Sequence, residues 1–179
     1  MHFISAILNI IYPNVCGICN KICKEDICVK CMVKLKAKKE CKKHIYLSKS
    51  YTYHMYIFLY DDFIRKNIIQ YKFGDHAYRH KSFVKFMLKD KKICGFLKKY
   101  DIIIPVPISK ERKIQRGYNQ SELIVKEINK TLKFIDIGTD ILYKVKNTPA
   151  QSSLNQAQRR YNLKDAYEVR NFEKIKNKK

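Results

Sequence analysis

Residues 101–124, with the sequence DIIIPVPISKERKIQRGYNQSELI, place an apolar run, a cationic segment and a helix-like segment in direct succession. The run DIII has the length and composition of a short buried strand. Pro105 ends it, because proline donates no hydrogen bond to a strand ladder. Cations follow in a predicted loop that closes at Gly117. Asn119 is a suitable N-cap for the next segment, NQSELIVKEINKTL, which predicts a helix. This strand–loop–helix order predicts an α/β fold with a partly parallel sheet.

The cationic loop has the features of an anion-binding site. In open α/β sheets, ligands lie outside the carboxyl ends of the strands, where this loop begins. The helix that starts near Asn119 directs backbone N–H groups and the positive end of its dipole toward the same space. Arg112 and Arg116 can each offer a bidentate fork to phosphate, and Gly117 allows the backbone to approach an anion closely. A nucleic-acid surface and an ordinary solvated turn are the two alternatives.

The chain is strongly basic. Its 179 residues contain 38 Lys and Arg against 16 Asp and Glu, which gives a formal net charge of +22. Such a charge predicts attraction to polyanions such as DNA, RNA or anionic lipid. The chain is also rich in Lys, Ile, Asn and Tyr, a bias that an AT-rich genome would produce without selection for DNA binding. Charge alone therefore leaves the partner open.

No run of 18 apolar residues occurs in the chain, so we expect no membrane span. Residues 1–11 are apolar but short, and they lack the basic start and the small-residue cleavage site of a signal peptide. Their apolar side chains recur at helical spacing. We therefore expect an amphipathic helix that packs against its own protein.

Four of the seven cysteines form two CxxC pairs, Cys16 with Cys19 and Cys28 with Cys31. A CxxC turn places both thiolates on one side of a tight knuckle, and two knuckles supply the four tetrahedral ligands of a structural Zn²⁺ site. Asn20 follows the first pair, where such a knuckle often needs a left-handed residue. The alternative is a set of buried free thiols. The odd cysteine number and the CxxC pattern indicate a reducing compartment, so we expect a cytoplasmic protein.

The other three cysteines carry weaker signals. Cys23 lies between the two pairs as a spare thiol, and Cys41 with His44 forms a CxxH pair that no second pair completes. Cys94 falls in or at the end of a predicted helix, where we expect it to be buried and inert.

The rest of the chain alternates between predicted strands and helices, after a lysine-rich linker or solvated surface at residues 34–44. The aromatic and β-branched stretch 51–60 predicts a strand. Asp61 or Asp62 can cap a helix that ends at Gly74 in a left-handed turn. Beyond it we expect a helix over residues 81–100, a strand over residues 140–145, and a helix, a turn and a strand over residues 153–169.

Together these segments resemble the ComF/GntX family of competence-associated, amidophosphoribosyltransferase-like proteins. The segments IIYPNVCGICN and ICVKCM are similar to the zinc ribbon of that family, and IIQYKFGD to its Lys-aromatic-x-Gly segment. The most specific match is IIIPVPISKERKIQRGYNQSELI, which contains the Pro-Val-Pro strand end followed by Arg-Gly-aromatic-Asn-Gln. The segment KNTPAQSSLNQAQRRYNLKDAYEV carries the Thr-x-x-Gln, Leu, Arg, Asn-Leu and Ala-aromatic pattern.

The resemblance implies a type I phosphoribosyltransferase-like fold behind a zinc ribbon. Residues 1–45 would hold the N-terminal helix, the ribbon and a basic linker, and residues 46–179 a partial phosphoribosyltransferase-like domain. Arg159 and Asn162 would lie in or beside the flexible loop over the site. By the same analogy, the pyrophosphate of phosphoribosyl pyrophosphate would face a set of six residues: Arg112, Arg116, Gly117, Tyr118, Asn119 and Gln120.

The family association implies a role in natural transformation, with single-stranded DNA as ligand and a helicase-like competence protein as partner. One departure bears on catalysis, because the acidic Asp-Asp-x-x-Thr-Thr-Gly loop of the family is absent from these 179 residues. That loop grips the ribose and 5′-phosphate, and Mg²⁺ would enter only with the diphosphate. We therefore expect a truncated, degenerate scaffold without turnover. The alternatives are a phosphoribosyltransferase completed by a separate chain and a remnant of an interrupted gene.

Overall fold

The computed structural model describes residues 13–45, 53–74, 76–149 and 151–179. The chain forms two compact units, residues 1–95 and residues 96–179. The predicted helix at residues 1–11 lies outside the described residues. The predicted division after residue 45 is not tested by this grouping and stays a prediction.

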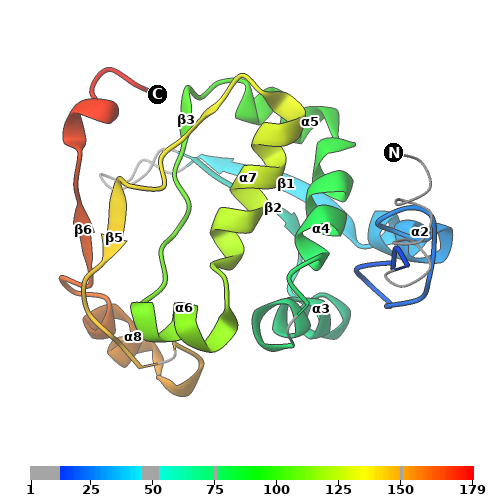
Figure 1. Ribbon diagram of the computed structural model, residues 1–179, viewed down its shortest axis with the longest axis horizontal. Coiled ribbons are helices and arrows are strands. Elements are labelled where there is room, and N and C mark those ends of the chain that lie inside the picture. Colours follow the sequence, from blue (N-terminus) through cyan, green and yellow to red (C-terminus); the bar gives the residue numbers. More distant parts are fainter. Residues whose placement is uncertain (1–12, 46–52, 75, 150) are drawn as a thin grey trace. The chain divides into compact units, whose positions relative to one another are not determined.

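The first unit contains the cysteine module and the helices that pack against it. Its core joins Cys16, Ile18 and Cys31 of the module to Ile64 and Phe86 of two later helices. The metal candidate therefore shares a hydrophobic core with those helices. In chain order (Figure 1) the elements are α2 Val29–Ala37, β1 Lys39–Ile45, β2 Tyr53–Phe58, α3 Asp62–Phe73, α4 Arg79–Leu88 and α5 Lys91–Leu97, which ends just inside the second unit.

Of the two predictions for residues 34–44, the linker is wrong, because this stretch completes α2 and then forms β1. Leu35 and Cys41 are buried in it. The solvated surface is confirmed for its lysines, which are exposed over residues 34–43. β1 pairs antiparallel with β2, with Lys42 opposite Tyr56. The predicted strand at residues 51–60 is confirmed over Tyr53–Phe58. A half-buried aromatic strand needs a neighbouring strand for its backbone hydrogen bonds, and the lysine-rich segment is that neighbour. The charged side chains of this segment stay on the surface.

Two helix predictions need correction. Asp61 caps α3 by accepting a hydrogen bond from the Ile64 N–H at 2.8 Å, but Gly74 ends the helix at φ −110°, outside the left-handed region. The single helix expected over residues 81–100 is two helices, α4 and α5. Asp90 interrupts it, since its Oδ1 accepts the N–H groups of Lys92 at 2.7 Å and Ile93 at 3.3 Å. A side chain that caps a new helix competes with continuation of the previous one.

The buried apolar residues of the second unit include two on α7 and three that directly precede strands. Val125 and Ile128 of α7 are buried, as are Ile135, Ile141 and Ala166. The helix predicted after Asn119 is confirmed. In chain order the elements are β3 Ile102–Ile103, α6 Lys110–Arg116, α7 Gln120–Leu132, β4 Asp136–Ile137, β5 Leu142–Lys144, η1 Gln151–Ser153, α8 Gln156–Asn162, β6 Tyr167–Val169 and η2 Phe172–Lys174.

The cationic segment that the sequence assigned to a loop is a short helix, α6. Ser109 caps its start by accepting the Arg112 N–H at 3.4 Å, and Gly117 ends it in the left-handed conformation at φ 73°. A serine cap and a glycine stop bound these seven residues, which form a helix of about two turns. The arginines therefore lie on a helix surface.

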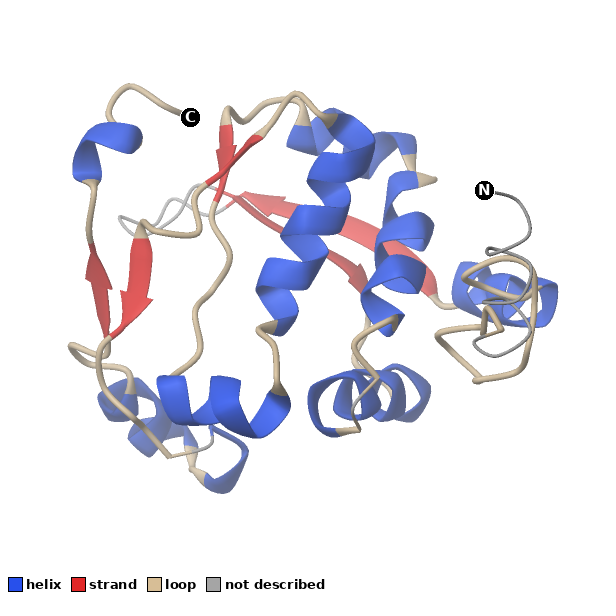
Figure 2. Cartoon of the chain, in the orientation of Figure 1, coloured by secondary structure: helices blue, strands red, loops and turns tan. Residues whose placement is uncertain are grey.

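The fold is mixed α/β. The described strands form three two-stranded sheets (Figure 2), of which β3–β4 is parallel and β1–β2 and β5–β6 are antiparallel. The expectation of one partly parallel sheet is met only by the short β3–β4 pair. The type I phosphoribosyltransferase-like architecture stays a prediction.

Candidate metal centre and candidate anion site

The four predicted metal ligands come together in the first unit. The Val15–Ile22 bridge closes the first knuckle, and within it the Asn20 N–H donates to the Cys16 carbonyl at 2.8 Å. Asn20 has the predicted left-handed backbone, with φ 62°. The second pair stands at the start of α2, where Cys28 is the N-cap residue. A knuckle and a helix start thus face each other with two thiols each.

The sulfur geometry fits a tetrahedral metal ion. The Sγ atoms of Cys16, Cys19, Cys28 and Cys31 all lie within 4.8 Å of one another, and Cys19 Sγ is 3.8 Å from Cys28 Sγ. Four thiolates around Zn²⁺ at about 2.3 Å have sulfur–sulfur distances of about 3.8 Å. The cluster can therefore hold a metal ion, and four sulfurs leave no open coordination position.

The electrostatics of the cluster favour a cation. Burial, followed by the neighbouring thiols of Cys19 and Cys28, raises the pKa of Cys31. Burial opposes ionisation of Cys16 too, but the backbone N–H groups of Cys28, Cys19 and Ile18 lower its pKa to about 7. Four thiolates at this spacing repel one another, and a divalent ion at their centre removes that repulsion.

The other cysteines do not join the cluster. Cys23 Sγ donates to the Glu25 carbonyl at 2.7 Å, and Cys94 Sγ donates to the Leu88 carbonyl at 3.2 Å. Cys41 is buried in β1, while the side chain of His44 is outside the described part of the chain. Among the described residues, the four-cysteine cluster is the only group of His, Cys, Asp and Glu side chains placed to hold a metal ion.

The predicted anion-binding residues lie together in the second unit, around α6 and the start of α7. Arg116 Nη1 donates to Gln120 Oε1 at 3.2 Å. Asn119 is buried, with its Oδ1 accepting the Ser121 N–H at 3.0 Å and its Nδ2 donating to the Val106 carbonyl at 3.1 Å. Asn119 therefore fixes the turn between the two helices. The half-buried Tyr118 of this turn lies near Arg116.

Sequence reasoning missed a third cation at this site, Lys144 of β5. Burial and then the charge of Arg112 lower the pKa of Lys144, and the same two causes in the same order lower the pKa of Arg116. The described ion pairs include neither Arg112 nor Lys144. Partly buried cations that repel one another provide a favourable position for an anion. The sequence predicts a strand over residues 140–145, but a strand pattern does not show which part of the chain Lys144 lies near.

The two residues expected on the flexible-loop side brace their own segment. Arg159 Nε donates to the carbonyls of Gln151 and Leu154, each at 3.0 Å, and Asn162 Nδ2 donates to the Pro149 carbonyl at 3.3 Å. The link from this segment to the anion site is made by Arg112, whose Nη2 donates to the Thr148 carbonyl at 2.8 Å. A role of Arg159 or Asn162 over a ligand stays a prediction.

These features define a mixed α/β protein with a four-cysteine cluster that could hold a metal ion and with a group of cations. Comparison with curated proteins finds competence protein F of Haemophilus influenzae, 35% identical over 82 residues, which are 46% of this chain and 35% of that protein. The predicted resemblance to the ComF family is thereby confirmed. The chain covers about a third of the length of this relative.

No family model matches the chain. No solved structure matches it either. Among the described residues, no helix is both long enough and apolar enough to cross a membrane.

Proposed function

We propose that this chain is a ComF-like competence accessory protein that binds single-stranded DNA during uptake or handling of incoming strands. The observation that carries the proposal is the pair of arginines on α6, where Arg112 donates to the Thr148 carbonyl at 2.8 Å and Arg116 donates to Gln120 at 3.2 Å. Lys144 of the same unit lies within range of the charge of Arg112. The similarity to competence protein F supports the biological role. A helicase-like competence protein in the cytoplasm is the partner that this role implies.

The physical basis is contact with the phosphate backbone. A single strand bends freely, so a compact cluster of cations can meet successive phosphates without reading their sequence. Arginine forks suit phosphate oxygens, and the partial burial of Arg116 and Lys144 strengthens each contact by lowering the local dielectric constant. The formal charge of +22 adds long-range attraction.

The test is the salt dependence of single-stranded DNA binding by the full chain. Each phosphate neutralised on a single strand contributes about 0.7 to the slope of log K against log salt, so Arg112→Gln with Arg116→Gln should reduce the slope by about 1.4. The matched control is Lys98→Gln with Lys99→Gln, which removes the same charge from exposed side chains of the same unit. Equal slopes for the two double variants, or no binding by the wild type at low salt, would contradict the proposal.

The second candidate function is phosphoribosyl transfer by this chain with a separate one. The order β3, α6, α7 with arginines beside the start of α7 favours it. Calorimetric titration with phosphoribosyl pyrophosphate and Mg²⁺ separates the two functions. We expect no measurable binding, because the Asp-Asp-x-x-Thr-Thr-Gly motif is absent from the sequence, and micromolar affinity would favour the enzyme.

We further propose that the ion held by Cys16, Cys19, Cys28 and Cys31 is Zn²⁺ in a structural role. Four thiolates suit a borderline-soft d¹⁰ ion in tetrahedral geometry. When bound, the ion would stabilise the fold of the first unit and supply no catalytic chemistry.

A further inference from the structure

Arg79, at the first residue of α4, is fully buried in the first unit and donates to the first cysteine knuckle. Its Nη1 donates to the carbonyl of Gly17 at 2.6 Å, and its Nη2 donates to Asn20 Oδ1 at 2.9 Å. The same guanidinium donates to Asn67 Oδ1 at 3.0 Å and Gln70 Oε1 at 2.8 Å, both on α3. One side chain thus connects the loop between two metal ligands to α3 and α4.

Ser82, one turn further along α4, holds the other side of Gly17. Its Oγ accepts the Gly17 N–H at 3.1 Å and donates to the Asp26 carbonyl, close to the second cysteine pair. The fit leaves no space at Gly17, because an added Cβ would lie 2.2 Å from Ser82 Oγ and 3.1 Å from Arg79 Cα. Both backbone groups of Gly17 therefore contact α4, and its N–H is shared with the Asp26 carbonyl at 3.0 Å within the module.

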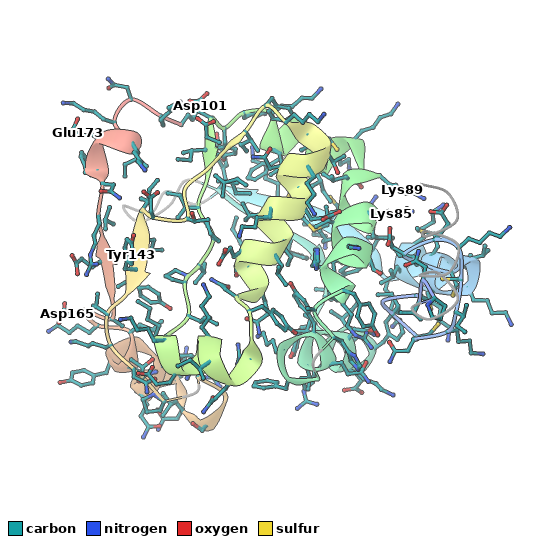
Figure 3. All side chains as sticks on the ribbon, viewed as in Figure 1. Lys85, Lys89, Asp101, Tyr143, Asp165 and Glu173 are labelled. Carbon is teal, nitrogen blue, oxygen red and sulfur yellow. The ribbon has the colours of Figure 1, made fainter. Side chains whose placement is uncertain are left out.

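A third contact comes from the same face of α4. Lys85, labelled in Figure 3, pairs with Glu25, and its Nζ lies 3.5 Å from Asp26 Oδ2. Both acidic residues lie between the two cysteine pairs in the sequence. Arg79, Ser82 and Lys85 follow one another at intervals of three residues, which places them on one side of a helix. All three contact the backbone or side chains of the cysteine module.

We propose that Arg79 and Ser82 are positioning residues of the metal centre, which set the Cys16–Asn20 knuckle in the geometry that binds the ion. Hydrogen bonds to α4 fix the orientation of backbone groups in the knuckle, and this preorganises the sulfurs of Cys16 and Cys19 for metal binding. The buried guanidinium also donates to the knuckle of a centre that would carry two net negative charges when four thiolates hold a divalent ion. The inference rests on the proposed zinc site and concerns residues outside the ligand set.

The test measures Zn²⁺ affinity of the full chain by competition with a chromophoric chelator, for Ser82→Ala, Arg79→Lys and Arg79→Met. We expect affinity to fall by about 10- to 100-fold in each, as is usual when the groups that orient metal ligands are removed. Lysine should fail to substitute, because a single ammonium cannot replace the planar fork. Arg65→Met on the exposed face of α3 is the matched control, with the same side-chain change and the same loss of charge. It should bind as the wild type does.

A second readout separates positioning from general stability. Co²⁺ bound in place of Zn²⁺ reports ligand geometry through its absorption spectrum, and we expect Ser82→Ala to shift its bands. The shift in melting temperature on adding Zn²⁺ should also shrink in the variants. If Arg79→Met fails to fold, Ser82→Ala decides the outcome. Unchanged affinity and spectrum in Ser82→Ala and Arg79→Lys would overturn the inference, whereas failure of the wild type to bind Zn²⁺ would overturn the zinc site itself.

Discussion

At the scale of single residues, Gly95 and Gly117 have the same open surroundings but different backbones. A Cβ added to either one would meet no heavy atom within 4 Å. Gly95 lies inside α5, whereas Gly117 has φ 73° at the end of α6. Space is therefore not the constraint at either position, and the backbone alone decides the effect of a substitution.

We predict opposite effects of alanine at these two glycines. Gly117→Ala should destabilise the chain by about 1 kcal/mol, because a side chain in the left-handed region crowds the backbone. Gly95→Ala should stabilise it by about 0.5–1 kcal/mol, because glycine inside a helix loses the most conformational freedom on folding. Denaturant unfolding measures both changes in the free energy of unfolding, and changes of the same sign would contradict the assignment of these conformations.

At the scale of elements, caps decide where helices begin and end. Ser109 and Gly117 make α6 from a segment whose charges suggested a loop, and Asp90 separates α4 from α5. The Asp90 carboxylate also pairs with Lys39 of β1. That ammonium, together with the N–H groups of Lys92 and Ile93, lowers the pKa of Asp90 although burial opposes this. Because the pKa of Asp90 is lowered in the folded state, its carboxylate stabilises the fold at pH values above the ordinary pKa of an aspartate. This contribution is lost as the pH falls through the pKa of Asp90 in the folded chain.

We predict that Asp90→Ala lowers the free energy of unfolding at pH 7 by about 1–2 kcal/mol, the usual cost of losing a helix cap. Asp90→Asn should cost less, because its side-chain oxygen still accepts the helix N–H groups and only the pairing with Lys39 is removed. The difference between wild type and Asp90→Ala should shrink as the pH falls below about 4. Asp165→Asn, at an exposed position, is the control. A difference that stays constant from about pH 7 to about pH 3 would contradict the role of the charged form.

At the scale of the whole molecule, the two compact units hold different chemistry. The four-cysteine cluster contributes Cys16 and Cys31 to the core of the first unit, so a bound ion and that core stabilise each other. The cations of the proposed DNA site belong to the second unit, whose buried residues include Val125 and Ile128. Metal and anion binding can therefore be perturbed one at a time.

We predict that removal of the metal by a chelator loosens the first unit and spares the second. Hydrogen exchange followed by mass spectrometry should show faster exchange in α3 and α4, since Arg79 and Ser82 tie α4 to the ligand loop. Exchange in α7 should not change. Readdition of Zn²⁺ is the control and should restore protection. Equal loss of protection in α4 and α7 would show that the metal stabilises the whole chain and not the first unit.

The sequence by itself determined the features that depend on neighbouring residues. The two CxxC pairs identify four residues that could hold a metal ion, and Asp61 and Asn119 identify helix starts, because knuckles and caps form within a few residues. Only the tertiary structure decided which distant residues support them. Arg79 reaches Gly17 across 62 positions, and Lys144 of β5 comes within range of the charge of Arg112 on α6. Such contacts depend on how helices and strands pack against one another. Packing depends on the complementary shapes of surfaces built from distant residues, and a local sequence pattern does not specify those shapes.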